Sequence, residues 1–326
     1  MQDHQSAGVH AAGVPSDAHV GEDPEPEETD GSILESLPVS FEMVLLAPSI
    51  LILAVISIIP LAVMLWLSVM EIQFTPVNEQ TFVGVQNYAD MVADANVWGA
   101  WQATAIYVSG SLILQLTLGV LIAVLLHRVS RGENVLTSVV IMPMMIAPVV
   151  VGLLWQFLLN PDFGLYTYLL NVVGLFETEP VLGTANSAMA AIIVMDTWEW
   201  TPLVVLIILA RLKSIPEHLY DAAQVDGATG IAQFRYVTLP LLKPAIAIAL
   251  LLRSMDLMRY FAKVFITTGG GPSNQTKIIG LYVYQQALRF FNLGYGAAAG
   301  LVMLLVTIIM GLFFVEAVMG GAGDDE

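Results

Sequence analysis

Six long apolar stretches constrain the fold of this chain more than any other feature of its sequence. An α-helix needs about 20 predominantly apolar residues to cross the hydrocarbon core of a bilayer. The stretches that meet this requirement are Met43–Val69, Ala103–Leu126, Thr137–Leu159, Ala188–Ala210, Pro244–Phe265 and Ala297–Met319. Of the 326 residues, 57% are hydrophobic and 12% are charged, and the charged share is about half that of an ordinary soluble domain. The sequence therefore predicts an all-α membrane protein with six transmembrane helices.

Prolines interrupt two of these predicted spans. The third span contains Pro143 and Pro148, and the fourth contains Pro202. A membrane helix tolerates proline where neighbouring groups or water satisfy the freed carbonyl. Each position predicts either a kink beside a cavity or a purely structural bend.

The Lys and Arg residues of the short loops predict how the chain is oriented, because cytoplasmic loops carry the excess of positive charge. Six basic residues fall between spans two and three or between spans four and five: Arg128, Arg131, Arg211, Lys213, Arg235 and Lys243. The loop after span five carries Lys277 and Arg289. The loops between spans two and three and between spans four and five, together with both termini, are therefore predicted to be cytoplasmic.

The ends of the chain and its cysteine content exclude several classes of site. Residues 1–40 hold nine acidic residues and no Lys or Arg, a composition that cannot bury enough apolar surface to fold. We expect an acidic disordered tail there, without the basic start of a signal peptide, and a short acidic tail at 320–326. The absence of cysteine excludes disulfides and thiolate metal sites, and the five His residues show no ligand spacing. No metal is therefore expected.

The loop between spans four and five has the pattern of a short helix–turn–helix. Pro216 and Glu217 suit a helix N-terminus. Apolar residues recur at helical spacing over 219–225, and Gly227 can end that helix in a left-handed conformation. A second short helix should follow and be broken by Pro240 before span five. A unit this small has no core of its own and suits docking in the groove of another protein.

Within this loop the chain reads Asp221-Ala222-Ala223, then Gly227, then Val237-Thr238-Leu239-Pro240. The segment resembles the EAA loop of permease subunits in binding-protein-dependent ABC importers. That pattern is Glu-Ala-Ala, three residues, Gly, nine residues, Ile, any residue and Leu-Pro. Every spacing is kept, and the replacements of Glu by Asp and of Ile by Val preserve charge or shape.

Three further segments are similar to the sugar branch of that family, the MalF-like permeases. They are Phe82-Val83-Gly84-Val85-Gln86-Asn87-Tyr88, Asn160-Pro161-Asp162-Phe163-Gly164 and Thr267-Thr268-Gly269-Gly270-Gly271-Pro272. The resemblance covers about residues 41–319, and the trehalose and maltose permeases look nearest. It implies a type I ABC importer permease fold in a bacterial or archaeal plasma membrane. A first transmembrane helix and outer loop (41–96) would precede a permease core (97–319), which contains the coupling loop (212–243).

The resemblance also implies the function and the partners. The chain would move a sugar from an extracytoplasmic binding protein into the cytoplasm by alternating access. A second permease subunit, expected to form a heterodimer, would complete the pathway, and two ATP-binding subunits would supply ATP and Mg. The residues expected to couple the chain to the ATPase are Asp221, Ala222, Ala223, Gly227, Leu239 and Pro240. An importer of a non-sugar solute such as polyamine or phosphate stays open, because the same loop serves every branch.

Other classes of function lack support in the sequence. No GxxxxGK[ST] loop is present, so no cofactor is expected on this chain. No HExxH or GxSxG cluster favours a membrane-embedded enzyme. A channel would have to transport without nucleotide. The expected surroundings are membrane lipid, and nothing predicts a nucleic-acid partner.

Polar residues inside spans four and five are candidates for the substrate pathway, because ionisable groups in membrane helices are costly and often functional. Asp196, Glu199 and Trp200 fall on one helical face. Carboxylates could accept hydrogen bonds from sugar hydroxyls, and indole rings could cover sugar C–H groups. The resemblance adds that substrate contacts come from the two helices that flank the coupling loop. The candidates are Asp196, Trp198, Glu199, Trp200, Arg253, Asp256, Leu257 and Tyr260.

These candidates also have structural interpretations. Trp198 and Trp200 could belong to the aromatic belt at the membrane interface. Arg253 and Asp256 could be a buried pair that fixes helix packing. In a heterodimer, the other permease subunit could hold the main substrate contacts.

The residues after span five are expected near the outer face. Arg259 and Lys263 should extend to the outer interface. Aromatic residues within Ile279–Phe291 could contact the binding protein or form an interfacial helix. They are Tyr282, Tyr284, Phe290 and Phe291.

Overall fold

The computed structural model of the chain describes residues 41–73, 79–129, 131–176 and 179–320. The chain divides into two units, residues 1–59 and 60–326. Within the first unit the described residues, 41–59, are helical, and this helix, α2 (Phe41–Ser68), ends in the second unit. The predicted tail at 1–40 and residues 321–326 lie outside the described residues, and the boundary predicted between 96 and 97 stays a prediction.

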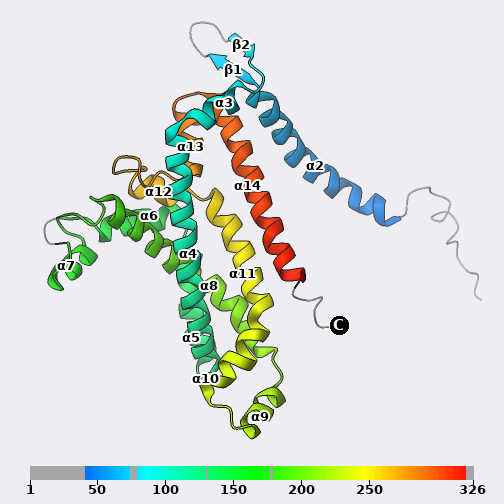
Figure 1. Cartoon of the computed structure of the whole chain (residues 1–326), viewed down its shortest axis with the longest axis vertical. Helices are drawn as coiled ribbons and strands as arrows, with labels where there is room; N and C mark the ends of the chain where they lie inside the picture. The colour runs from blue at the N-terminus through cyan, green and yellow to red at the C-terminus, as the bar shows by residue number, and fades with distance from the viewer. Residues whose placement is uncertain (1–40, 74–78, 130, 177–178, 321–326) are drawn as a thin grey trace, which may run out of the picture. The chain divides into compact units, whose positions relative to one another are not determined.

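The second unit is built almost entirely of helices (Figure 1). A hairpin and two helices come first: β1 (Met70–Gln73), β2 (Glu79–Phe82), α3 (Gln86–Ala93) and α4 (Ala95–His127). The middle of the chain forms α5 (Glu133–Ile141), η1 (Met142–Met145), α6 (Pro148–Leu158), α7 (Leu165–Val172) and α8 (Ala185–Lys213). Next are α9 (Glu217–Val225), α10 (Gly230–Gln233), η2 (Phe234–Thr238) and α11 (Leu239–Arg259). The last elements are α12 (Ala262–Thr267), α13 (Ile279–Tyr284), η3 (Gln285–Arg289) and α14 (Leu293–Gly320).

Five of the six predicted spans are confirmed as helices long and apolar enough to cross a membrane. Among the described residues these are Leu45–Ser68, Ala95–His127, Ala185–Lys213, Gly230–Arg259 and Leu293–Glu316. The fifth helix ends at Arg259, so the prediction that it continues to Phe265 is wrong. The residues beyond it turn into the separate helix α12.

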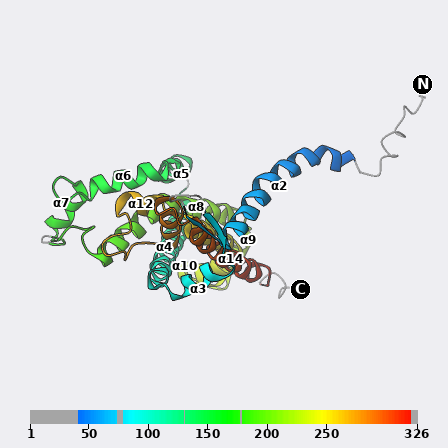
Figure 2. The same ribbon diagram turned by 90° about the horizontal axis from the view of Figure 1, so that it is seen from above.

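The third predicted span, Thr137–Leu159, is not one helix. The segment up to Met145 and helix α6 meet at an angle of 92°. Ala147 is extended, with φ −62° and ψ 135°, because the ring of the following Pro148 disfavours a helical conformation before it. Seen from above, α6 and α7 lie to one side of α4 and α14 (Figure 2). The two prolines that predicted a kink therefore mark a full break.

The pair α4 and α8 forms the most extensive helix contact of the second unit. Small residues let the two backbones approach closely, as is usual between membrane helices. A Cβ atom added to Gly119 of α4 would lie 2.5 Å from Cγ1 and 2.7 Å from Cβ of Val204 on α8. Ala123, Val204 and Ile208 belong to one buried cluster that also includes Leu242 of α11. The core thus joins α4, α8 and α11.

The hairpin after α2 was not expected from the sequence. Strands β1 and β2 are antiparallel, with Met70 opposite Phe82. The side-chain amide of Asn87 donates to the backbone oxygens of Ser68 (2.8 Å) and Met70 (3.1 Å). A buried amide therefore fastens α3 to the start of the hairpin. The start of α4, which directly follows α3, lies at the opposite end of that helix from the coupling loop (Figure 1). We call this the outer end, following the predicted orientation.

A second polar contact ties α13 and α14 to the start of α4. The carboxylate of Asp94 accepts hydrogen bonds from the hydroxyls of Tyr282 (2.7 Å) and Tyr295 (3.2 Å). Burial alone would raise the pKa of Asp94, but the hydrogen bonds it accepts, that from Tyr282 foremost, hold this pKa below its usual value. Tyr282 is buried, whereas Phe290 and Phe291 are exposed.

We predict that Gly119→Ala destabilises the protein, because the stiff β-branched side chain of Val204 cannot turn away from the added methyl. Overpacking of this kind costs about 1–3 kcal/mol. Gly99→Ala on the same helix is the matched control, since nothing lies within 4 Å of its Cβ position. Thermal unfolding of the purified complexes should rank Gly119→Ala below both Gly99→Ala and the wild type. Equal unfolding temperatures for the two variants would contradict the close approach of α4 and α8.

Candidate functional site

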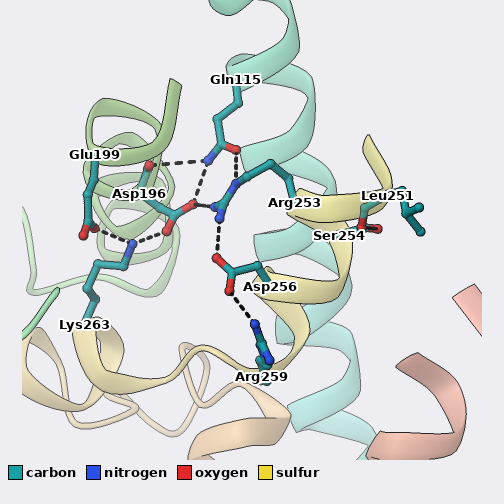
Figure 3. A network of polar contacts seen from close by, with 9 residues as sticks. All are labelled: Gln115, Asp196, Glu199, Leu251, Arg253, Ser254, Asp256, Arg259 and Lys263. Carbon is teal, nitrogen blue, oxygen red and sulfur yellow. Dashed lines mark hydrogen bonds and ion pairs between the residues drawn. The ribbon is translucent and has the colours of Figure 1, made fainter. Parts of the chain in front are cut away.

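A buried network of charges joins four helices near the middle of α8 (Figure 3). The carboxylate of Asp196 on α8 pairs with the guanidinium of Arg253 on α11 at 2.9 Å. Its other oxygen pairs with the ammonium of Lys263 on α12. All three side chains are at most 2% exposed. Asp196 is therefore held between two cations in the interior of the protein.

Glu199 completes the charge balance of the network. It lies one turn beyond Asp196 on α8, and its Oε2 accepts from the Lys263 ammonium at 2.8 Å. Two buried carboxylates thus face two buried cations. An isolated buried charge costs several kcal/mol, whereas a paired and hydrogen-bonded one can be tolerated. The expectation that Lys263 reaches the outer interface is wrong, because its side chain is 1% exposed and fully engaged by carboxylates.

Gln115 on α4 is a member of the network that the sequence did not indicate. Its amide nitrogen donates to Asp196 at 2.7 Å, and its oxygen accepts from Nε of Arg253 at 2.8 Å. A neutral amide can donate and accept at once, so Gln115 satisfies both members of an ion pair. A polar residue in the middle of an apolar span was the available signal, but a single amide did not stand out beside the charged residues.

The outer edge of the network is less enclosed. Arg253 also pairs with Asp256 at 2.5 Å, which confirms the expected contact between these two residues. Asp256 in turn accepts from Arg259 at 3.4 Å, whose side chain is 72% exposed. Leu257, predicted as a pathway residue, is completely buried in the apolar core.

Aromatic rings cover one side of the charges. The guanidinium of Arg253 lies 4.7 Å from the centre of the Trp200 ring, and Tyr260 packs edge-on against Trp200 at 6.4 Å. Trp200 is therefore packed within the protein rather than placed in an interface belt. Trp198 points elsewhere: it is 37% exposed and contacts Trp155 of α6 at 6.2 Å. The sequence grouped the two tryptophans, and the structure separates them.

Two polar atoms at this site lack a hydrogen-bond partner among the described residues. They are Oε1 of Glu199 and Nε1 of Trp200. Both atoms are buried, and buried polar groups are nearly always satisfied in native structures. One acceptor and one donor next to the balanced charge network are therefore left unpaired.

The coupling loop has the predicted first helix and turn. Helix α9 follows Pro216, carries Glu217 in its first turn and has no buried residue. Gly227 adopts the left-handed conformation expected of it, with φ +79°. The hydroxyls of Tyr220 and Thr238 lie 3.2 Å apart and link α9 to the segment before α11.

The predicted coupling residues lie on the open side of this loop. Asp221, Ala222 and Gly227 are exposed, as are Leu239 and Pro240 at its end, while Ala223 is half-buried. Large apolar side chains nearby are also exposed, namely Val225 (88%), Ile231 (83%) and Tyr236 (74%). Exposed large apolar side chains of this kind are typical of surfaces that contact another protein or the membrane.

The expected break at Pro240 is wrong. The segment from Gly230 runs into α11 as one apolar helix of 30 residues. A single π-helical turn, Phe234–Thr238, precedes the proline, and Pro240 sits in the first turn of α11. Proline has no backbone N–H to donate, and the π-helical turn just before Pro240 already interrupts the regular hydrogen-bond ladder there. The second half of the coupling loop is therefore continuous with α11.

The sequence from Gln115 onward matches a described protein family. Residues 115–316 match the family of the binding-protein-dependent transport system inner membrane component. The chain belongs to this family. It is accordingly a multi-pass inner membrane component of a transport system, and the match contains both the charge network and the coupling loop.

Several individual relatives align with this chain over most of their length. The trehalose/maltose transport system permease protein MalF of Thermococcus litoralis is 32% identical over 280 residues, which cover 85% of this chain and 92% of the relative. The trehalose transport system permease protein SugA of Mycobacterium tuberculosis is 30% identical, covering 83% and 86%. The probable ABC transporter permease protein y4oQ of Sinorhizobium fredii is 40% identical, covering 67% and 70%.

A solved structure has the same fold. One chain of a bacterial ABC transporter involved in the import of the acidic polysaccharide alginate matches with a TM-score of 0.73 at 22% identity. The match covers 85% of this chain and 94% of that chain. The fold is therefore that of an ABC importer permease, as the coupling-loop resemblance implied.

We predict that Lys263→Met strongly destabilises the protein, because it leaves Glu199 unpaired and removes one partner of Asp196. Breaking a buried ion pair costs about 3–5 kcal/mol. Adding Glu199→Gln should recover part of the loss, since Asp196 keeps Arg253. Arg259→Met is the control, because its exposed ion pair is worth little. Thermal unfolding of the purified complexes measures all three, and a Lys263→Met variant as stable as Arg259→Met would refute the buried network.

Proposed function

We propose that the chain is the transmembrane permease subunit of an ATP-driven importer that moves a sugar into the cytoplasm. The observation that carries this proposal is the family match combined with relatives named for trehalose/maltose and trehalose transport. A third relative, of Agrobacterium fabrum, is named a sulfoquinovosyl glycerol transport system permease protein, at 32% identity. A sugar or sugar derivative is thus common to these relatives, which favours it over polyamine or phosphate.

Power for transport would come from two ATP-binding partner subunits, and an extracytoplasmic binding protein would deliver the sugar to this subunit and a second permease. A related alginate transporter is described in complex with a periplasmic protein bound to an alginate pentasaccharide. In this chain, the exposed apolar side chains of Val225, Ile231 and Tyr236 support docking of the coupling loop on an ATPase.

The coupling loop would act as a lever on the pathway. Its two ends continue into α8 and α11, and these helices carry Asp196 and Arg253 of the charge network. Closure of the ATPase pair would move the loop, and α8 and α11 would move with it. The permease would then switch between inward-open and outward-open states, a two-state change biased by nucleotide and by the loaded binding protein.

The sugar would contact the side of the network where polar atoms are free. Asp196 and Arg253 already have hydrogen-bond and ion-pair partners within the network. They would therefore position the neighbouring groups rather than contact the sugar. Glu199 could accept a hydrogen bond from a sugar hydroxyl through Oε1, and Trp200 could donate one through Nε1. Tyr260, which packs against Trp200, would provide ring surface beside it.

Gly227→Pro should uncouple the ATPase from the binding protein. Proline fixes φ near −65° and removes the N–H that bonds to Gln224 at 3.0 Å, so the turn of the coupling loop cannot form. The complex, purified with its co-expressed partners in liposomes, would be tested with binding proteins loaded with trehalose, maltose or another sugar. One loaded protein should stimulate ATP hydrolysis in the wild type and fail to do so with Gly227→Pro.

Gly230→Ala is the control for the loop, because Gly230 has an ordinary φ and nothing lies within 4 Å of its Cβ position. This variant should keep the full ATPase response. If no ATPase copurifies, or if substrate moves without nucleotide, the importer proposal fails. If only a binding protein loaded with polyamine or phosphate stimulates, the non-sugar alternative holds instead.

Trp200→Phe should impair sugar transport without weakening the fold. The ring that covers Arg253 is largely kept, while the N–H that lacks an internal partner is removed. Loss of one neutral hydrogen bond is worth about 1 kcal/mol, or roughly fivefold in apparent sugar affinity. Uptake of radiolabelled sugar into proteoliposomes measures the effect, and the unfolding temperature of the same preparation shows whether the fold is intact. Unchanged uptake would remove Trp200 from the pathway.

A further inference from the structure

An open pocket lies at the outer end of the molecule, away from the charge network. Its volume is about 460 Å³, within the range of small-molecule sites. One wall is the first part of α4, with Asn96 and Gln102, and another is Asn186 at the start of α8. The third wall is the turn Ser273–Lys277, which follows the run of three glycines. Neither the coupling loop nor the proposed pathway residues line it.

The turn that forms the third wall has an unusual backbone. Ser273 and Asn274 both have positive φ, +50° and +64°, which costs energy for residues other than glycine. Gly270, with φ +95°, is needed because a Cβ there would lie 3.1 Å from Cβ of Lys277. Strained backbone of this kind is concentrated at functional sites. The glycine-rich segment that the sequence singled out thus builds a specific wall of the pocket.

Hydrogen bonds hold this turn in place. The hydroxyl of Thr276 donates to the backbone oxygen of Gly271 at 2.6 Å and lies 2.8 Å from the hydroxyl of Thr268. The backbone N–H of Ile279 donates to the hydroxyl of Thr104 on α4 at 2.8 Å. The turn is thereby fixed to the helix that forms the opposite wall, and the pocket is preformed.

The pocket presents groups that suit sugar hydroxyls. The side-chain amides of Gln102, Asn186 and Gln275 make no hydrogen bond to any residue that the structure describes. Each amide offers two donors and an acceptor, and a sugar hydroxyl can both donate and accept. Lys277 adds one cation, and no carboxylate lines the pocket. A cationic solute such as a polyamine would therefore be disfavoured there.

We propose that this pocket is an outer subsite that holds a sugar ring after its release from the binding protein and before it reaches Glu199 and Trp200. The inference rests on the proposed function and adds a second sugar-binding position to it. Donor and acceptor amides in a concave, preformed pocket fit a small polyhydroxylated ligand. A docking surface for a protein would instead centre on large buried anchors such as Trp, Tyr or Arg, which this lining lacks.

The absence of cysteine from the chain gives a direct test. Gln102→Cys introduces a single thiol into this subunit, and Gln86→Cys places one on exposed α3, outside the pocket. The whole transporter, in nanodiscs and held with a non-hydrolysable ATP analogue, would be mixed with binding protein that is sugar-free or loaded with trehalose. Mass spectrometry of this chain would follow alkylation by N-ethylmaleimide.

Trehalose-loaded binding protein should slow alkylation of the Gln102→Cys variant at least about fivefold relative to the sugar-free protein, because a thiol behind the sugar reacts only while the pocket is empty and fivefold slowing corresponds to roughly 80% occupancy. The Gln86→Cys variant should show no dependence on sugar. Equal protection by sugar-free and loaded protein would overturn the proposal and identify a protein-docking surface. No protection by either would also overturn it, since sugar would then not occupy the pocket.

A double variant separates this subsite from the importer function itself. Gln102→Ala with Asn186→Ala should reduce trehalose uptake at least about fivefold while ATPase stimulation by the loaded binding protein is kept. Loss of stimulation would mean that the pocket binds the partner protein, which overturns the subsite. If no sugar-loaded binding protein stimulates even the wild type, the proposed function has failed, and the subsite falls with it.

Discussion

The cost of placing charge inside a membrane protein is the constraint on which the rest of this structure depends. Asp196, Glu199, Arg253 and Lys263 are almost completely buried, and each would be expensive without a partner. The network therefore requires α4, α8, α11 and α12 to meet at one place, because the partners come from all four helices. Removing any one of these four charged side chains would leave a buried charge without its partner.

This arrangement connects the coupling loop at the surface of the chain to the interior. The coupling loop is continuous with α8 on one side and with α11 on the other, through the π-turn that admits Pro240. A network that ties the same two helices together leaves them few intermediate positions, since partly separated ion pairs would be buried and unsatisfied. Such a structure is suited to switching between two states rather than bending gradually.

The two ends of the proposed pathway use different chemistry. Around Glu199 and Trp200 the charges are internally balanced, and single polar atoms are free. At the outer end the pocket relies on neutral amides and one lysine. A sugar can bind to both kinds of surface through its hydroxyls without carrying charge, so neither position would hold it too tightly to pass on.

The sequence by itself determined the approximate place of five apolar helices, the first helix of the coupling loop with its turn at Gly227, and the placement of Arg253 and Asp256 on one helical face. These features are local, since they depend on the length of apolar runs, on backbone preferences or on spacing within one helix. Only the tertiary structure decided that Pro148 breaks the third span at 92°, that Gln115 joins the network and that Lys263 points inward. The chain turns back after Arg259, so that α12 places Lys263 beside α8, and residues more than 60 positions apart become partners. No pattern within one helix reveals such a partner, because the free energy of burying a charge depends on what the other helices bring to it.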